Sequence, residues 1–366
     1  FNRANVLADS AKYDKAIEDY NEHLKLSPQS HEGYHNRGVC WFRLAQNDKA
    51  IADFSAAISR KPDFVAAYGL RSSAFINTGH NDLAIKDCDE AIRLDPKFVP
   101  AYRNRAQAWA NMRDYPKAIQ DFDAALKLEP KSAETYNGRG LAYRHLNAPE
   151  KALKDFEEAL RLNPKLAPAH NNRALVWTDL QQYDKALKGF EESLQLDPRQ
   201  ANAFSGRARV WLVTKEYDKA IADCDEAIRL NPKFSPAYSN RAAAWVKKKD
   251  YDKAENDFQT ALKLSLSDWN CAEFAFFLAT CPDAKYRDAK KAIELAKKAS
   301  DMQPKNITNS SYLAVLAAAH AEEGNFAEAV QLQQKALTNP ILSASMRADW
   351  EARLALYQQQ KPYRDE

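Results

Sequence analysis

The sequence predicts an all-α fold in which one helical hairpin is repeated along the chain. Apolar residues recur at spacings of three, four and seven residues, the period of an α-helix, in two runs per repeat. A repeat that cannot bury its apolar face alone must stack on its neighbours, so we expect an α-solenoid. Each repeat closes with a proline, and these prolines lie 34 residues apart: Pro28, Pro62, Pro96, Pro130, Pro164, Pro198 and Pro232.

The stretch 99–132 shows the pattern most fully. A polar break at 111–114 separates its two apolar runs, which predicts two antiparallel helices. Pro116 suits the first turn of the second helix, where its missing N–H costs nothing. Pro130 ends that helix because its ring cannot continue the hydrogen-bonded ladder.

A 34-residue helix–turn–helix of this composition resembles the tetratricopeptide repeat (TPR) family. Residues 1–268 form eight regular repeats, of which the first is incomplete. Residues 269–343 are predicted to form two divergent repeats, and 344–366 a capping helix with a short polar tail. The resemblance implies a right-handed superhelix of about ten repeats.

The last hundred residues depart from the regular pattern. The segment LATCP…KYRD, the later LAAAHAEEGNFAEAV and the ending KPYRDE resemble the carboxyl-terminal portion of a group of bacterial TPR proteins. The final helix, about 344–359, is expected to cap the array because a terminal repeat needs a polar outer face. We predict that Trp350, Leu354 and Tyr357 point inward and that Arg347, Asp349, Glu351 and Arg353 point outward.

Composition excludes several classes of function. The 53 Lys and Arg against 50 Asp and Glu leave a net charge of +3, too small to indicate a nucleic-acid or membrane partner. No apolar run is long enough to span a membrane, so we expect a soluble chain that is cytoplasmic or exported after processing. The sequence opens at Phe1 without Met or a signal peptide, which indicates a processed form or a piece of a longer protein.

The cysteines and the motifs give no sign of catalysis. Five cysteines stand at apolar positions without a CxxC pair, so we expect small buried thiols and no metal or other cofactor. No HExxH, phosphate-loop or GxSxG motif is present, and we expect no enzyme activity. Two Asn-x-Ser/Thr sequons, at Asn306 and Asn309, are interpreted as incidental.

Arginine occupies the seventh position of every regular repeat, and an aspartate follows sixteen residues later in all but one. Such arginines could form a basic spine for an anionic ligand, but the co-occurrence favours bidentate, partly buried ion pairs that are structural. Arg173 has only Gly189 in its repeat, and we expect it to be free or paired elsewhere. The predicted pairs are Arg3/Asp19, Arg37/Asp53, Arg71/Asp87, Arg105/Asp121, Arg139/Asp155, Arg207/Asp223 and Arg241/Asp257.

The TPR resemblance also implies a peptide groove, because first helices line the concave surface of such arrays. Asparagines at the sixth position of alternate repeats resemble the asparagine ladder of the TPR arm of O-linked N-acetylglucosamine transferase. An amide can bond a peptide main chain as donor and acceptor, although bonds to a neighbouring helix are an equal alternative. The implied groove contains His35, Asn36, Phe42, Arg43, Asn77, Arg103, Asn104, Gln107, Asn111, Asn137, His145, Asn171, Asn172, Asp179, Asn240 and Lys247.

We therefore expect a non-catalytic scaffold that binds a protein or an extended peptide in its concave groove. One alternative is a substrate-docking arm of a larger bacterial enzyme, a kinase or glycosyltransferase whose catalytic part precedes Phe1. The other is a self-assembling solenoid. Its amino-terminal edge begins inside a first helix, and stacking of that edge on another copy would give head-to-tail oligomers or a filament.

Overall fold

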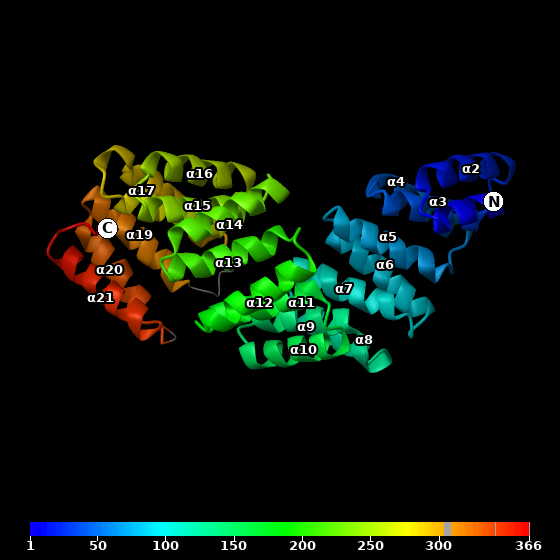
Figure 1. The fold of residues 1–366 in the computed structure, drawn as a ribbon, viewed down its shortest axis with the longest axis horizontal. Helices are drawn as coiled ribbons and strands as arrows, with labels where there is room; N and C mark the ends of the chain where they lie inside the picture. The colour runs from blue at the N-terminus through cyan, green and yellow to red at the C-terminus, as the bar shows by residue number, and fades with distance from the viewer. Residues whose placement is uncertain (304–308, 341, 366) are drawn as a thin grey trace. The chain divides into compact units, whose positions relative to one another are not determined.

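The computed structural model describes residues 1–303, 309–340 and 342–365, and these are helical without any strand (Figure 1). The prediction of an all-α repeat fold is confirmed. The first sixteen helices follow the eight predicted repeats, two to each: α1 (Asn2–Asp9), α2 (Tyr13–Leu26), α3 (His31–Arg43), α4 (Asn47–Arg60), α5 (Val65–Asn77), α6 (Asn81–Leu94), α7 (Val99–Asn111), α8 (Tyr115–Leu128), α9 (Ala133–His145), α10 (Pro149–Leu162), α11 (Ala167–Asp179), α12 (Tyr183–Leu196), α13 (Ala201–Val213), α14 (Tyr217–Leu230), α15 (Ser235–Lys247) and α16 (Tyr251–Leu264).

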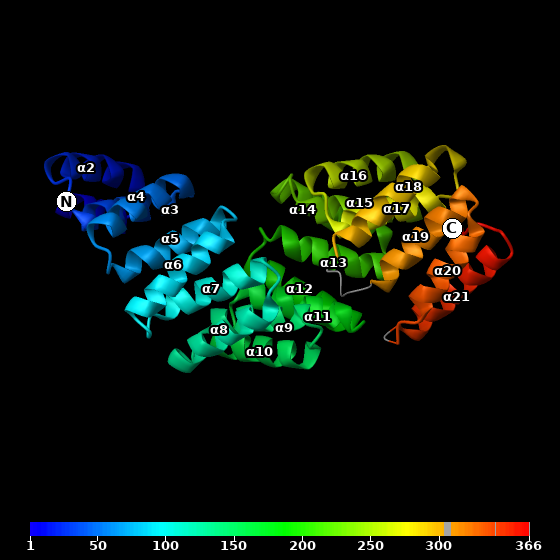
Figure 2. The same ribbon diagram turned by 180° about the vertical axis from the view of Figure 1, so that it is seen from behind.

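The divergent region continues with helix pairs. It contains α17 (Asp268–Thr280), the short 3-10 helix η1 (Ala284–Tyr286), α18 (Ala289–Asp301), α19 (Ser310–Glu323), α20 (Phe326–Leu337) and α21 (Ala344–Gln358). Figure 2 shows α18 beside α17, with which it packs. Of the two sequons, Asn306 lies outside the described residues, whereas Asn309 caps α19 by accepting a hydrogen bond from the Ser311 N–H at 3.0 Å.

The chain forms two compact units, Phe1–Gln182 and Tyr183–Glu366. The boundary lies in the sixth repeat, whose second helix has Gly189 in place of the usual aspartate. It does not lie at 268, where the regular repeats end. The Phe258 and Phe274 rings stack with centroids 5.7 Å apart, so the divergent repeats continue the core of the regular ones.

A residue with positive φ turns the chain between the two helices of each regular repeat. This conformation frees the last carbonyls of the first helix for turn bonds, such as the Asp114 N–H to the Trp109 carbonyl at 2.9 Å. A side chain makes the left-handed region costly, and only Gly79 avoids that cost. The φ angles run from 54° to 81° at Ala11, Ala45, Gly79, Arg113, Asn147, Gln181, Lys215 and Lys249.

Small and aromatic side chains fill the core of both units. Ala118 and Ala220 are fully buried at the position twelve residues before the closing proline, beside Phe122 and Cys224 in their repeats. All five cysteines are buried thiols without a disulfide, as predicted from their positions. Burial raises the pKa of the Cys88 thiol to about 12, which keeps it protonated and unreactive.

The last helix is a cap, but its charged face differs from the prediction. Trp350 and Tyr357 are buried as expected. The prediction that Arg347 and Arg353 point outward was wrong. Arg347 donates to the Leu337 carbonyl at 3.1 Å, and the Arg353 side chain is only 12% exposed. Arg347 turns inward because carbonyls at the end of α20 accept its hydrogen bonds, and Arg353 because its planar head covers the rings of Phe276 and Tyr363.

Candidate functional site

The first helices of the repeats lie on the inner side of each stack. Within each unit, neighbouring first helices such as α5 and α7, or α17 and α19, pack against one another. Neighbouring second helices make no comparable contact among the described residues. Since the first helices are the closer packed, the stack curves toward them. We call the surface of α3, α5, α7, α9, α11, α13, α15, α17 and α19 the inner face.

The arginine and aspartate columns form bidentate ion pairs between the two helices of a repeat. In each pair the Nε and Nη2 atoms donate to the two carboxylate oxygens at 2.5–2.8 Å. Arg173 also has an interaction partner, so it is not free. The seven pairs are Arg3–Asp19, Arg37–Asp53, Arg71–Asp87, Arg105–Asp121, Arg139–Asp155, Arg207–Asp223 and Arg241–Asp257.

The third guanidinium nitrogen reaches the second helix of the preceding repeat in Arg37, Arg71, Arg105, Arg139 and Arg241. Arg105 Nη1 donates to Asp89 at 2.5 Å, and Arg37 Nη1 donates to Asn21 at 2.7 Å. One arginine therefore fastens three helices. Three of its five N–H donors bind oxygens of the protein and its charge is paired, which argues against a spine of free cations for an anionic ligand.

The asparagines at the sixth position bond the preceding first helix. Asn104 Nδ2 lies 2.9 Å from the Gly69 carbonyl, and Asn240 Nδ2 lies 3.1 Å from the Ser205 carbonyl. Asn36 and Asn172 likewise donate to amide oxygens of neighbouring helices, at 3.1 and 3.0 Å. The geometry supports the interpretation in which these amides join repeats. Their carbonyl oxygens are the groups that they could offer to a peptide.

Other predicted groove residues also touch the preceding repeat. At the ends of the first helices, Asn77 donates to Asn47 at 3.4 Å and Asn111 donates to Asn81 at 3.0 Å. The His145 ring stacks on Tyr115 with centroids 4.7 Å apart. The remaining predicted residues vary in exposure on the inner face: Arg43 and Gln107 are exposed, Arg103 is half-buried and Asn171 is buried.

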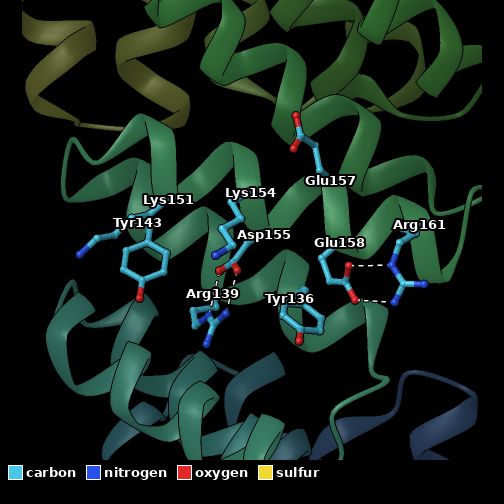
Figure 3. Close-up of a pocket in the computed structure, with 9 residues that line it drawn as sticks. All are labelled: Tyr136, Arg139, Tyr143, Lys151, Lys154, Asp155, Glu157, Glu158 and Arg161. Atoms are coloured by element: carbon cyan, nitrogen blue, oxygen red, sulfur yellow. Dashed lines mark hydrogen bonds and ion pairs between the residues drawn. The ribbon is translucent and has the colours of Figure 1, made fainter.

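A surface pocket of about 650 Å³ lies over α9 and α10 (Figure 3). Two ion pairs lie in it: Arg139 with Asp155, and Arg161 with Glu158 at 2.6 Å. The Arg139 guanidinium also lies over the Tyr136 ring, 5.4 Å from its centroid. Because the same ion pair recurs in other repeats, we interpret this pocket as a consequence of the repeat and not as a ligand site.

The inner face of the second unit holds a segment of the chain itself that contains no helix, Lys361–Asp365. We call this stretch the tail segment. Its Asp365 carboxylate accepts a hydrogen bond from Lys247 of α15 at 2.7 Å. The Asp365 N–H donates to the Thr280 carbonyl at the end of α17 at 3.0 Å. The segment is thus bound through both main chain and side chain.

The two preceding residues of the tail segment contact α17, α19 and α21. Arg364 forms an ion pair with Glu322 of α19 at 2.7 Å. The Tyr363 ring lies 6.3 Å from the Phe276 ring, and the Arg353 guanidinium covers both rings at 4.4 and 4.9 Å. We call the receiving residues the tail site: Lys247, Phe276, Thr280, Glu322 and Arg353.

A small cavity of about 190 Å³ adjoins the tail site between α15 and α17. Val246, Phe276 and Phe277 give it apolar walls, and the half-buried Glu273 adds one carboxylate. Burial raises the pKa of Glu273 to about 7, with Arg209 of α13 opposing the shift and Asp365 adding to it. The cavity can accept an apolar group beside a carboxyl that titrates near neutrality.

The sequence interpretation missed the tail site, apart from Lys247. One signal in the sequence points to it: the triplet Tyr-Arg-Asp occurs at 286–288 and again at 363–365. Arg287 of the first copy pairs with Glu322 at 2.9 Å, and this is the same carboxylate that Arg364 of the second copy uses.

Two absences concern the described residues. No helix among them is both long and apolar enough to cross a membrane. In the same residues, His, Cys, Asp and Glu form no cluster of three or more that could hold a metal ion.

Solved structures with a similar fold are repeat proteins. The APC/C hetero-tetramer Cut9–Hcn1 matches with a TM-score of 0.60 at 16% identity, over 81% of this chain and 54% of that chain. The chain therefore spans about half the length of that protein. A tetratricopeptide repeat protein from Parabacteroides merdae ATCC 43184 matches with a TM-score of 0.55 at 20% identity, over 74% of this chain and 99% of that one. None of the curated proteins matches the sequence.

Family models described as tetratricopeptide repeat match most of the sequence. The matches cover residues 1–63, 42–98, 99–132, 133–166, 173–233, 235–268 and 310–338. They follow the helix pairs that the structure contains and extend into the second divergent repeat. The chain is therefore a member of the tetratricopeptide repeat family.

Proposed function

We propose that this protein is an interaction scaffold that binds extended peptide segments of partner proteins on its inner face. The bound tail segment is the observation that carries the proposal. A stretch without helix lies on α15, α17 and α19, held by a main-chain hydrogen bond, two ion pairs and a ring contact. These are the interactions by which a peptide from another protein would be recognised.

The first unit supports the proposal through its polar inner face. Exposed amides such as Gln107 lie beside half-buried ones such as Asn104. The donors of the sixth-position asparagines serve the repeats, so we assign peptide contacts to their carbonyl oxygens and to Gln107 and Arg103. The two other predicted roles, a docking arm of a larger enzyme and a self-assembling solenoid, stay predictions.

A peptide selection tests this proposal. A random peptide library is selected on the full chain, and the affinity of each selected peptide is measured by fluorescence anisotropy. Arg103→Glu on α7 and Lys247→Glu on α15 reverse a charge on the inner face of each unit. Lys127→Glu on α8 and Lys263→Glu on α16 make the same change on exposed positions of second helices.

We expect at least one inner-face variant to weaken a selected peptide tenfold or more and both second-helix variants to leave its affinity unchanged. Selected peptides that respond only to the second-helix variants would overturn the proposal, as would peptides that respond to none of the four. Circular dichroism spectra of all variants show whether the helices are retained.

A further inference from the structure

We propose that the tail segment is a displaceable internal ligand, and that the partner binding at the tail site presents an aromatic residue followed by arginine and an acidic residue. This inference rests on the proposed function and specifies the partner for the second unit. The occupant to which we commit is a segment of another protein with this triplet chemistry.

The contacts define one requirement for each residue of the triplet. The first residue lies against Phe276 and beneath the Arg353 guanidinium, an arrangement that favours an aromatic ring. The second reaches Oε2 of Glu322, the oxygen of this largely buried carboxylate that Arg287 does not contact, and an anionic oxygen there favours a cation. The third meets the Lys247 ammonium, which favours a carboxylate.

The duplicate triplet supports the same requirement independently. Residues 286–288 repeat the sequence Tyr-Arg-Asp within the chain. Here too the tyrosine packs on aromatic rings: Tyr286 lies 5.6 Å from Tyr251 and 6.2 Å from Phe277. Arg287 pairs with Oε1 of Glu322 at 2.9 Å, whereas Arg364 pairs with Oε2 of the same carboxylate. The second unit therefore binds the aromatic residue and the arginine of the triplet twice, and both arginines pair with Glu322.

The contacts of residues 363–365 can be taken over by another peptide, whereas those of residues 286–288 cannot. Residues 286–288 lie between α17 and α18, and Asp288 also caps α18 by accepting from the Lys291 N–H at 3.0 Å. Removing this copy would disrupt a repeat. Residues 363–365 belong to no helix, and α21 ends before them at Gln358, so their contacts can be released without unfolding a helix.

A tethered segment competes at an effective concentration that is on the order of millimolar for a short linker. A free peptide therefore binds the intact chain with an apparent Kd that approaches this concentration. If the contact residues of the tail segment are replaced, the same peptide binds with its intrinsic Kd because no tethered segment competes with it. The inference thus predicts a large difference between two forms of one protein.

The probe is the fluorescein-labelled peptide QQKPYRDE, the sequence of residues 359–366. It is titrated by anisotropy against the full chain and against an open variant carrying Tyr363→Ser, Arg364→Ser and Asp365→Ser. We expect at least tenfold tighter binding to the open variant. A peptide with the same residues in scrambled order, QYDKPREQ, should bind neither form.

Receptor variants are made on the open form. Lys247→Ala should weaken the probe tenfold or more. Lys248→Ala, the adjacent lysine of α15, should leave its affinity unchanged because Lys248 pairs with Asp218 of α14. Glu322→Gln should also weaken the probe, but it disturbs Arg287 as well, so Lys247→Ala decides the question.

Equal probe affinity for the intact and open forms, or an open form insensitive to Lys247→Ala, would overturn the inference. In that case, library-selected peptides that still bind the inner face would leave the proposed function standing. If no selected peptide bound the inner face either, the inference and the proposed function would both be refuted. Light scattering tests whether the tail site is instead occupied by the tail segment of a second copy of the chain. An intact chain that is dimeric and an open form that is monomeric would show exchange of the tail segment between copies and overturn the partner assignment.

Discussion

Replacement of Arg105 by alanine is expected to lower the free energy of unfolding by about 3–5 kcal/mol, the cost of leaving a buried charge without its partner. The structure indicates this size because Asp121, the partner of Arg105, has a side chain only 9% exposed and accepts two hydrogen bonds from it, at 2.8 and 2.6 Å. Arg105 itself is 22% exposed, so we expect the lower end of the range.

Two further variants separate burial from charge. Asp89→Ala removes the other carboxylate of Arg105, which is 55% exposed, and should cost about 0–1 kcal/mol. The double change Arg105→Met with Asp121→Leu replaces the ion pair by apolar groups and should recover most of the loss.

The assay is urea unfolding followed by circular dichroism and by tryptophan fluorescence. Repeat arrays can unfold in more than one step, so free energies are compared only where the two signals coincide. A loss below about 1 kcal/mol for Arg105→Ala would refute the reasoning, since exposed pairs give values of that size. Equal losses for Asp89→Ala and Arg105→Ala would refute it too.

Three other changes have defined outcomes in thermal or urea unfolding. Gly79→Ala should destabilise by about 1 kcal/mol because Gly79 has a φ of 81°, whereas Ala45→Gly, at a φ of 57°, should have the opposite sign. Asn104→Ala should cost about 1 kcal/mol by removing its hydrogen bonds to Gly69 and Ser72 of the preceding repeat, and no loss would contradict its role between repeats. Burial raises the pKa of Glu273 from 4.5 to about 7, so the folded chain holds a proton that the unfolded chain releases. The contribution of Glu273 to stability should therefore fall as pH rises from about 4.5 to 7, so Glu273→Gln should gain stability relative to the unchanged chain over this range; a difference that stays constant with pH would contradict the burial of Glu273.

The repeats and their ion pairs could be predicted from sequence because they are local and periodic. A proline every 34 residues and an arginine sixteen residues before an aspartate recur often enough to define the helices and their partners. Arg105 and Asp121 lie on adjacent helices of one repeat, so their spacing alone brings them together.

The tail site could not be predicted in this way because its contacts join distant parts of the chain. Lys247 and Asp365 are 118 residues apart, and no periodicity relates them. Arg353 was assigned to the outer face by its charge, whereas the rings of Phe276 and Tyr363 keep it inside. The role of Asn104 was open because an amide suits a peptide and a neighbouring helix equally, and only its distance to Gly69 distinguishes them.

Photo-crosslinking tests most directly whether the inner face is the peptide-binding surface. Benzoylphenylalanine is placed at Gln107 or Ala243 on first helices, and at Lys127 or Lys263 on second helices, and each chain is irradiated with a library-selected peptide. We expect a crosslinked product from one or both first-helix positions and none from the second-helix positions. Crosslinks formed only at Lys127 or Lys263 would contradict it.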